Sequence, residues 1–239
     1  MKVAGSSIES VLSAACGPED LLTGPSKEDV AQGVLDQFIN SNNIEASSGQ
    51  AMWHSHTDPI NFFSATGSDW DDYFKITCIR NPWDLCVSYY WWSIQKNFYD
   101  NNKDPGEYFW AKNGKNEYGL PALILQEDSV ATKQKKFKDF LLCDWAERRG
   151  NIISCVDFLS RESNKFIHEK INYYIMFESL QKDIDQLSNI LNFDFGNLPR
   201  LKSGLRNSQI DIRDYYSKDT EKLVSEKFNK IIDSFNFRL

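Results

Sequence analysis

Residues 74–88 read FKITCIRNPWDLCVS and predict a strand that is followed at once by a helix. Residues 74–79 are rich in β-branched and apolar side chains, as strands are. Pro82 suits the first turn of a helix, because its fixed φ is already helical and that turn does not need the missing N–H. Arg80 therefore stands at the carboxyl end of a strand in a βα unit, where open parallel sheets bind their ligands.

The pattern of apolar residues elsewhere predicts a mixed α/β chain. Helical spacing predicts helices over residues 8–15 and about 218–235, and one after residue 177 with Ile184, Leu187, Ile190 and Leu191 on one face. Two further strands are expected, over residues 151–159 and 171–177. We find no internal repeat, so one domain is expected to span residues 1–239.

One part of that domain departs from the pattern, a variable excursion at about residues 97–150. Residues 97–122 are rich in Asn, Gly, Asp and Lys, and a loop of this length is usually functional or disordered. A run of lysines follows and is interpreted as a solvated helix face: Lys133, Lys135, Lys136 and Lys138.

Composition limits the class of protein. With 239 residues, 41% of them hydrophobic, the chain can bury one substantial core. A formal net charge of −7 argues against non-specific binding of nucleic acid, which needs a basic face. No apolar run approaches the roughly 20 residues that span a bilayer, and serines interrupt the N-terminal stretch where a signal peptide is apolar. Five cysteines without a CxxC pair fit reduced thiols, so we expect a cytoplasmic protein.

The stretch KVAGSS at residues 2–7 is a small-residue turn that leads into the first helix. Such a turn presents backbone N–H groups to a phosphate, and the helix dipole adds attraction. It is not a Walker A loop, because the order G-x-x-x-x-G-K-[ST] is absent. Taken alone, the stretch fits an ordinary serine-capped helix better than a phosphate site.

Arg80 and Ser88 form a second candidate phosphate site. The arginine at the strand end offers a forked donor, and the serine two helical turns on offers a rotatable one. The alternative, a helix-capping arginine and a surface serine, explains the strand-Arg-Asn-Pro order less well.

These stretches together resemble the sulfotransferase family. KVAGSSIE at residues 2–9 is similar to the family's 5′-phosphosulfate loop. FKITCIRNPWDLCVSYYW at residues 74–91 is similar to the strand and helix that bind the 3′-phosphate in that family. Its RNPWD variant is typical of the carbohydrate sulfotransferase-like branch. YYIMFESLQKD at 173–183 resembles that branch's strand ending in F-E-x-L. LPRLKSGLRNSQIDIRDYYSKDT at residues 198–220 resembles a loop late in that branch's sequence that contains paired tyrosines, and we call this segment the late loop. The matches follow the family's order and are spread over nearly the whole chain, except for residues 97–150, which match little.

The resemblance implies a P-loop NTPase-like parallel sheet flanked by helices. In that family a hydrophobic strand precedes the phosphate loop, whereas this chain begins inside the loop at Lys2, so the first strand is expected to be missing. A loop held at one end only would place Lys2 less accurately, and an error of about an ångström costs ~100-fold in rate.

The resemblance also implies a reaction and its residues. The co-substrate would be 3′-phosphoadenosine 5′-phosphosulfate (PAPS), and the acceptor a hydroxyl, with a carbohydrate expected. Lys2 would neutralise charge on the departing nucleotide. The implied nucleotide-binding residues are Gly5, Ser6 and Ser7 at the 5′-phosphosulfate, Arg80 and Ser88 at the 3′-phosphate, and Lys202, Ser203 and Arg206 from the late loop. Lys202 stands where the family pattern has Asn, and Met176 where its strand often has Arg.

A base for the acceptor hydroxyl is expected among the histidines, which titrate nearest neutral pH. His56 is the first choice and His54 the second, because both lie between the two nucleotide elements where the family often places its histidine. An ordinary loop histidine is the alternative for each. The HxH pair has no Cys or further His at a ligand spacing, so no metal is expected.

Two other functions remain open on these residues. A non-catalytic or degenerate nucleotide-binding homologue on the same fold would bind nucleotide without turnover. A P-loop kinase or NTPase is disfavoured by the absent Walker A order. The acceptor is expected near residues 53–66 and 97–122, whose aromatic side chains can stack on sugar rings.

Overall fold

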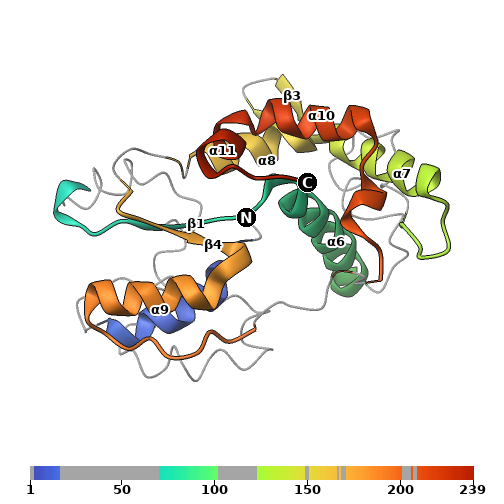
Figure 1. Cartoon of the computed structure of the whole chain (residues 1–239). Coiled ribbons are helices and arrows are strands. Elements are labelled where there is room, and N and C mark those ends of the chain that lie inside the picture. The colour runs from blue at the N-terminus through green and yellow to red at the C-terminus, as the bar shows by residue number, and fades with distance from the viewer. Residues whose placement is uncertain are drawn as a thin grey trace. The chain divides into compact units, whose positions relative to one another are not determined.

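The computed structural model describes residues 3–16, 70–101, 123–148, 151–165, 167, 171–200, 206 and 209–239. The protein is mixed α/β, mostly helical, with a small parallel sheet (Figure 1). The chain divides into two compact units, each made of separated segments. Unit 1 comprises Val3–Arg80 and Lys165–Ser203, and unit 2 comprises Asn81–Asn164 and Gly204–Leu239.

Unit 1 is built on a parallel strand pair. β1 (Ile76–Ile79) pairs with β4 (Tyr173–Met176) in the register Ile76 to Tyr173 through Ile79 to Met176. Because the strands are parallel, their carboxyl ends meet at one edge. The strand predictions over 74–79 and 171–177 are confirmed with narrower bounds, and Phe177 already belongs to the 3₁₀ turn η4 (Phe177–Ser179).

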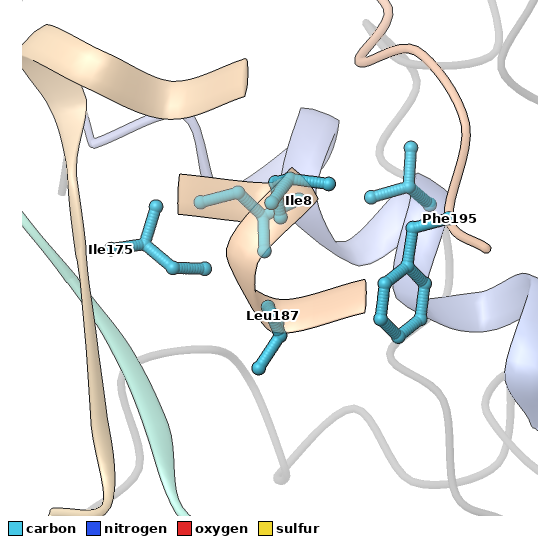
Figure 2. Packing of buried hydrophobic residues seen from close by; sticks show 6 residues of the cluster. Ile8, Ile175, Leu187 and Phe195 are labelled. Carbon is cyan, nitrogen blue, oxygen red and sulfur yellow. The ribbon is translucent and has the colours of Figure 1, made fainter. Parts of the chain in front are cut away.

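Two helices pack beside this strand pair. They are α1 (Gly5–Leu12), continued by the 3₁₀ turn η1 (Ser13–Ala15), and α9 (Leu180–Leu191); a further 3₁₀ turn, η2 (Trp70–Asp72), precedes β1. The buried cluster that joins the helices to β4 is shown in Figure 2 and consists of Ile8, Val11, Ile175, Ile184, Leu187 and Phe195. The side chains of Ala4 and Cys78 pack against this cluster, so the start of α1 and strand β1 share one core.

Two of the four residues that were predicted to form the buried apolar face of α9 are buried. Ile184 and Leu187 are fully buried, but Ile190 is 53% exposed and Leu191 is also exposed. The buried face instead includes Asp183, because its carboxylate binds the end of β4. This bond fixes which side of the helix faces the core.

Unit 2 is mainly helical. Its elements are α6 (Pro82–Asn101), α7 (Val130–Leu142), β2 (Asp144–Arg148), β3 (Asn151–Ser154), α8 (Cys155–Asn164), the 3₁₀ turn η5 (Ile212–Tyr215), α10 (Lys218–Lys227) and α11 (Asn229–Phe235). Pro82 is the first residue of α6, as predicted. The fully buried Tyr90 of this helix makes edge contacts with Phe137 and Phe140 at centroid distances of 5.9 and 5.2 Å. These aromatic contacts join α6 to α7 in the core of unit 2.

The strand predicted over residues 151–159 is correct only as far as Ser154. β3 pairs antiparallel with β2, and a helix begins at Cys155. The Ser154 hydroxyl donates to the Asp157 carboxylate at 2.7 Å and accepts the Asp157 N–H at 3.3 Å. This reciprocal capping pair starts a helix where the apolar run alone suggested a longer strand.

Three other predictions about unit 2 need correction. Residues 97–101 continue α6, so the loop that was predicted to begin at residue 97 does not begin there; residues 102–122 lie outside the described part. The last helix is broken at Phe228 into α10 and α11. Lys133 is not solvated: it is 7% exposed, and its Nζ lies 3.7 Å from Asp214.

Within the part of the chain that the structure describes, every helix is too short or too polar to cross a bilayer.

Candidate functional site

Arg80 lies directly after β1, at the carboxyl edge of the parallel pair. Its guanidinium carbon stands 3.7 Å from the centroid of the Phe177 ring, and Phe177 directly follows β4. A guanidinium over an aromatic face gains a cation–π attraction. This contact places the guanidinium of the arginine that was predicted from the sequence against the ring that follows β4.

Charges of both signs surround Cys78 at the same edge. Burial, together with the Glu178 and Asp183 carboxylates, raises the pKa of the Cys78 thiol to about 12, and the charge of Arg80 opposes this rise. The thiol therefore stays protonated at neutral pH and is no nucleophile there. Arg80 is the residue at this edge that suits an anion.

Asp183 organises the turn from β4 to α9. Its carboxylate accepts the Met176 N–H at 2.6 Å and the Ser179 hydroxyl at 3.0 Å, while 7% of the residue is exposed. The Tyr173 hydroxyl lies 3.0 Å from the main-chain oxygen of Asp183. Asp183 was not predicted from the sequence, although an acid in the first turn of a helix is a recognisable signal.

The start of α1 is not an ordinary serine-capped helix. The N-cap residue is Ala4, with φ 60° and ψ 23°, and within the described residues 3–16 no side chain caps this helix. The first i to i−4 hydrogen bond runs from the Ile8 N–H to the Ala4 oxygen at 3.0 Å. Gly5, Ser6 and Ser7 thus occupy the first turn, whose amides precede the helical hydrogen-bond pattern at the positive end of the dipole.

This turn has room at Gly5 and little at Ser7. A Cβ added at Gly5 would meet no atom within 4 Å. Ser7 is 5% exposed, in contrast to a surface serine. The left-handed backbone conformation falls at Ala4 and not at the neighbouring Gly5, although a glycine adopts this conformation at a lower cost in free energy.

Two predicted phosphate residues belong to unit 2. Ser88 lies in the second turn of α6 and is half-buried. The Arg206 Nη1 donates to the Asp84 Oδ1 at 2.6 Å, and both side chains are partly buried. Asp84 belongs to the RNPWD motif, so this ion pair ties the late loop to the first turn of α6.

The remaining residues of that motif have structural roles. The Asn81 Oδ1 accepts the Trp83 N–H at 3.0 Å, which caps α6, and the Asn81 Nδ2 donates to the Arg238 oxygen at 2.7 Å. The Tyr216 hydroxyl donates to the Trp83 oxygen at 2.8 Å. The motif therefore starts the helix and fixes its position within unit 2.

Five of the site residues that were predicted from the sequence lie outside the described part of the chain: Lys2, His54, His56, Lys202 and Ser203. The same holds for residues 53–66 and for 102–122 of the expected acceptor region. In the portion that the structure describes, no three His, Cys, Asp or Glu side chains are grouped so as to hold a metal ion.

The comparisons with known proteins came back empty. No family model, no curated protein and no solved structure matches this chain.

Proposed function

We propose that the protein transfers a sulfuryl group from PAPS to an acceptor hydroxyl, with a carbohydrate as the expected acceptor, on a P-loop-like sulfotransferase fold. The observation that carries the proposal is the placement of Arg80. It directly follows β1 of a parallel pair and is held over Phe177. A forked, permanently charged donor at the carboxyl edge of parallel strands suits a phosphate.

The 3′-phosphate is the group that Arg80 would bind. Guanidinium N–H pairs match the oxygens of a phosphate in a bidentate manner, which a lysine does not reproduce. Ser88 would add a hydroxyl donor, in keeping with the sequence resemblance. Arg206 offers five N–H donors in all, so its bond to Asp84 is compatible with a second contact to nucleotide.

The 5′-phosphosulfate would lie at the start of α1. The amides of Gly5, Ser6 and Ser7 form the first turn, at the positive end of the helix dipole. Arg80 and this turn belong to the same compact unit, and Ala4 packs on the core that includes β4. These features support a nucleotide with phosphate groups at both ends.

The reaction needs charge neutralisation, alignment and a base. The acceptor oxygen forms a bond to sulfur while the bond from sulfur to the bridging phosphate oxygen breaks. Lys2 would stabilise the charge on that departing oxygen. His56, or His54 in its place, would take the acceptor proton. The late-loop residues Lys202 and Ser203 would close over the nucleotide.

A thermal-shift measurement tests nucleotide binding. At 100 times the dissociation constant, adenosine 3′,5′-bisphosphate should stabilise the intact protein by about 2.7 kcal/mol, which raises its Tm by roughly 5–10 °C. Arg80→Ala should abolish the rise, and Arg80→Lys should restore little of it because the fork is lost. Arg161→Ala removes an exposed arginine of α8, outside the proposed nucleotide-binding residues, and should leave the rise unchanged. No rise in the unaltered protein would contradict the proposal.

Turnover is tested separately with ³⁵S-labelled PAPS and a panel of glycans. A labelled product that disappears in His56→Ala supports sulfuryl transfer. Nucleotide binding without any product would support the alternative, a non-catalytic homologue. Competition by ATP stronger than by PAPS would instead support a kinase or NTPase.

A further inference from the structure

Three thiols lie near one another in the core of unit 2. They belong to Cys86 of α6, to Cys143 at the end of α7 and to Cys155 at the start of α8. Cys86 and Cys155 are fully buried, whereas Cys143 is partly exposed. Nothing in the proposed transfer reaction uses these cysteines.

The backbone brings Cys143 and Cys155 directly opposite each other. In the β2–β3 ladder Asp144 pairs with Ser154, so the next position outward pairs Cys143 with Cys155. The Cys155 N–H donates to the Cys143 oxygen at 3.0 Å, which extends the ladder to this pair. Opposed antiparallel residues have Cα atoms about 4.5–5.5 Å apart, and disulfides need about 4.4–6.8 Å.

The side chains also meet. The Cys143 thiol donates to the Phe140 oxygen at 2.9 Å, and the Cys155 thiol is hydrogen-bonded to Cys143. The two sulfur atoms are therefore already neighbours, and a bond between them needs little backbone movement.

We propose that Cys143 and Cys155 are a dithiol modification site that hydrogen peroxide oxidises to a reversible disulfide. The Cys143 thiolate attacks one peroxide oxygen, the O–O bond breaks, and the products are a sulfenic acid and, after protonation, water. The Cys155 sulfur then attacks the sulfenic sulfur, losing its proton, and the hydroxyl leaves as a second water. Two thiols are oxidised by two electrons, and one hydrogen peroxide is reduced.

The environments of the thiols set this order of events. Cys143 is the partly exposed member of the pair, so peroxide meets it first. Burial and the neighbouring thiols raise the pKa of Cys155, so this sulfur stays protonated until a sulfenic acid forms beside it. Burial raises the pKa of Cys86 to about 12, which makes Cys86 a poor competitor.

Hydrogen peroxide is the probe for the test. The intact, folded chain is treated with it, the remaining thiols are alkylated, and the chain is digested without reduction. The thiol count of the denatured protein should fall from five to three. A peptide pair joined through Cys143 and Cys155 should appear, and dithiothreitol should restore both thiols.

Matched variants make the result specific. Cys143→Ser should prevent the cross-link. Cys16→Ser should leave it unchanged, although Cys16 is likewise a partly exposed cysteine at a helix end whose thiol donates to a main-chain oxygen. A cross-link through Cys86, or sulfinic acid at Cys143 without any cross-link, would overturn the proposal. The measurement on the unaltered chain decides the matter even if a variant fails to fold.

Discussion

Asp183 shows how much one side chain contributes to the candidate site. Its carboxylate accepts two hydrogen bonds at the end of β4, one residue before the ring on which Arg80 stacks. Removing the carboxylate leaves a main-chain donor of Met176 without this acceptor, and a buried group in that state costs about 1–3 kcal/mol. The position of Phe177 depends on the same turn.

We predict that Asp183→Ala destabilises the protein by about 2 kcal/mol, a fall in Tm of roughly 4–8 °C. Differential scanning fluorimetry measures the change. Asp185→Ala is the matched control on the same helix, because its carboxylate is exposed and accepts a hydrogen bond from the Gln181 side chain four residues away. Equal falls in Tm for both substitutions would show that the hydrogen bonds of Asp183 at this turn contribute no more to stability than an exposed carboxylate does.

Single residues of the site were predictable to different degrees. Arg80 was placed correctly at the strand end, because a short β-rich run before Asn-Pro is a strong local signal. Its stacking on Phe177 was not foreseen, since the partner lies 97 residues away and only the pairing of β1 with β4 brings it near. The Arg206–Asp84 ion pair escaped prediction for the same reason.

At the scale of elements, an ion pair joins α10 to α8 and makes stability depend on pH. The Lys227 Nζ lies 2.7 Å from the Asp157 Oδ1. Burial raises the pKa of Asp157, but hydrogen bonds from Lys227 and Ser154 outweigh burial and hold the pKa below its usual range. A lowered pKa means that the folded state favours the charged form. This stabilisation is therefore present at neutral pH and is lost as the pH falls through the folded-state pKa.

We predict that Asp157→Asn lowers the Tm at pH 7, and that the gap to the unaltered protein narrows below about pH 4. Thermal melts over a pH series measure it. Asp139→Asn should change the Tm little at any pH, because Lys135 and Asp139 form an exposed pair with side chains 78% and 58% accessible. A gap that stays constant with pH would refute the assignment to this ion pair.

Elements were predicted best where local signals act alone. The beginning of α6 at Pro82 and the two parallel strands followed from short patterns. The boundary between β3 and α8 did not follow from such a pattern, because the apolar run continues across it. The hydrogen bonds between Ser154 and Asp157 determine where the helix begins. The exposed Ile190 and the buried Lys133 were misjudged because tertiary partners, not spacing, determine their burial.

At the scale of the whole molecule, the chain from Val3 onward passes between the two units three times. One passage is short: β1 ends at Ile79 and α6 begins at Pro82. Asn81, within this passage, caps α6 and bonds to Arg238 near the end of the chain. The sequence predicted a single domain, and this interleaving of segments favours cooperative unfolding.

We predict one calorimetric transition, with equal van't Hoff and calorimetric enthalpies. Two core substitutions sharpen the test: Ile175→Ala in unit 1 and Phe137→Ala in unit 2, both at fully buried positions. Each should cost about 2–5 kcal/mol and move the same single peak. Two peaks, of which each substitution moves only one, would show instead that the units unfold independently.

The uneven protection of the cysteines has a practical use. Burial raises the pKa of Cys78, Cys86 and Cys155, so these sulfur atoms react slowly with maleimide dyes near neutral pH. Cys16 and Cys143 remain as accessible attachment points, one in each unit. A donor and an acceptor fluorophore on this natural pair would report, by energy transfer in the reduced protein, how far apart the units are before and after nucleotide is added.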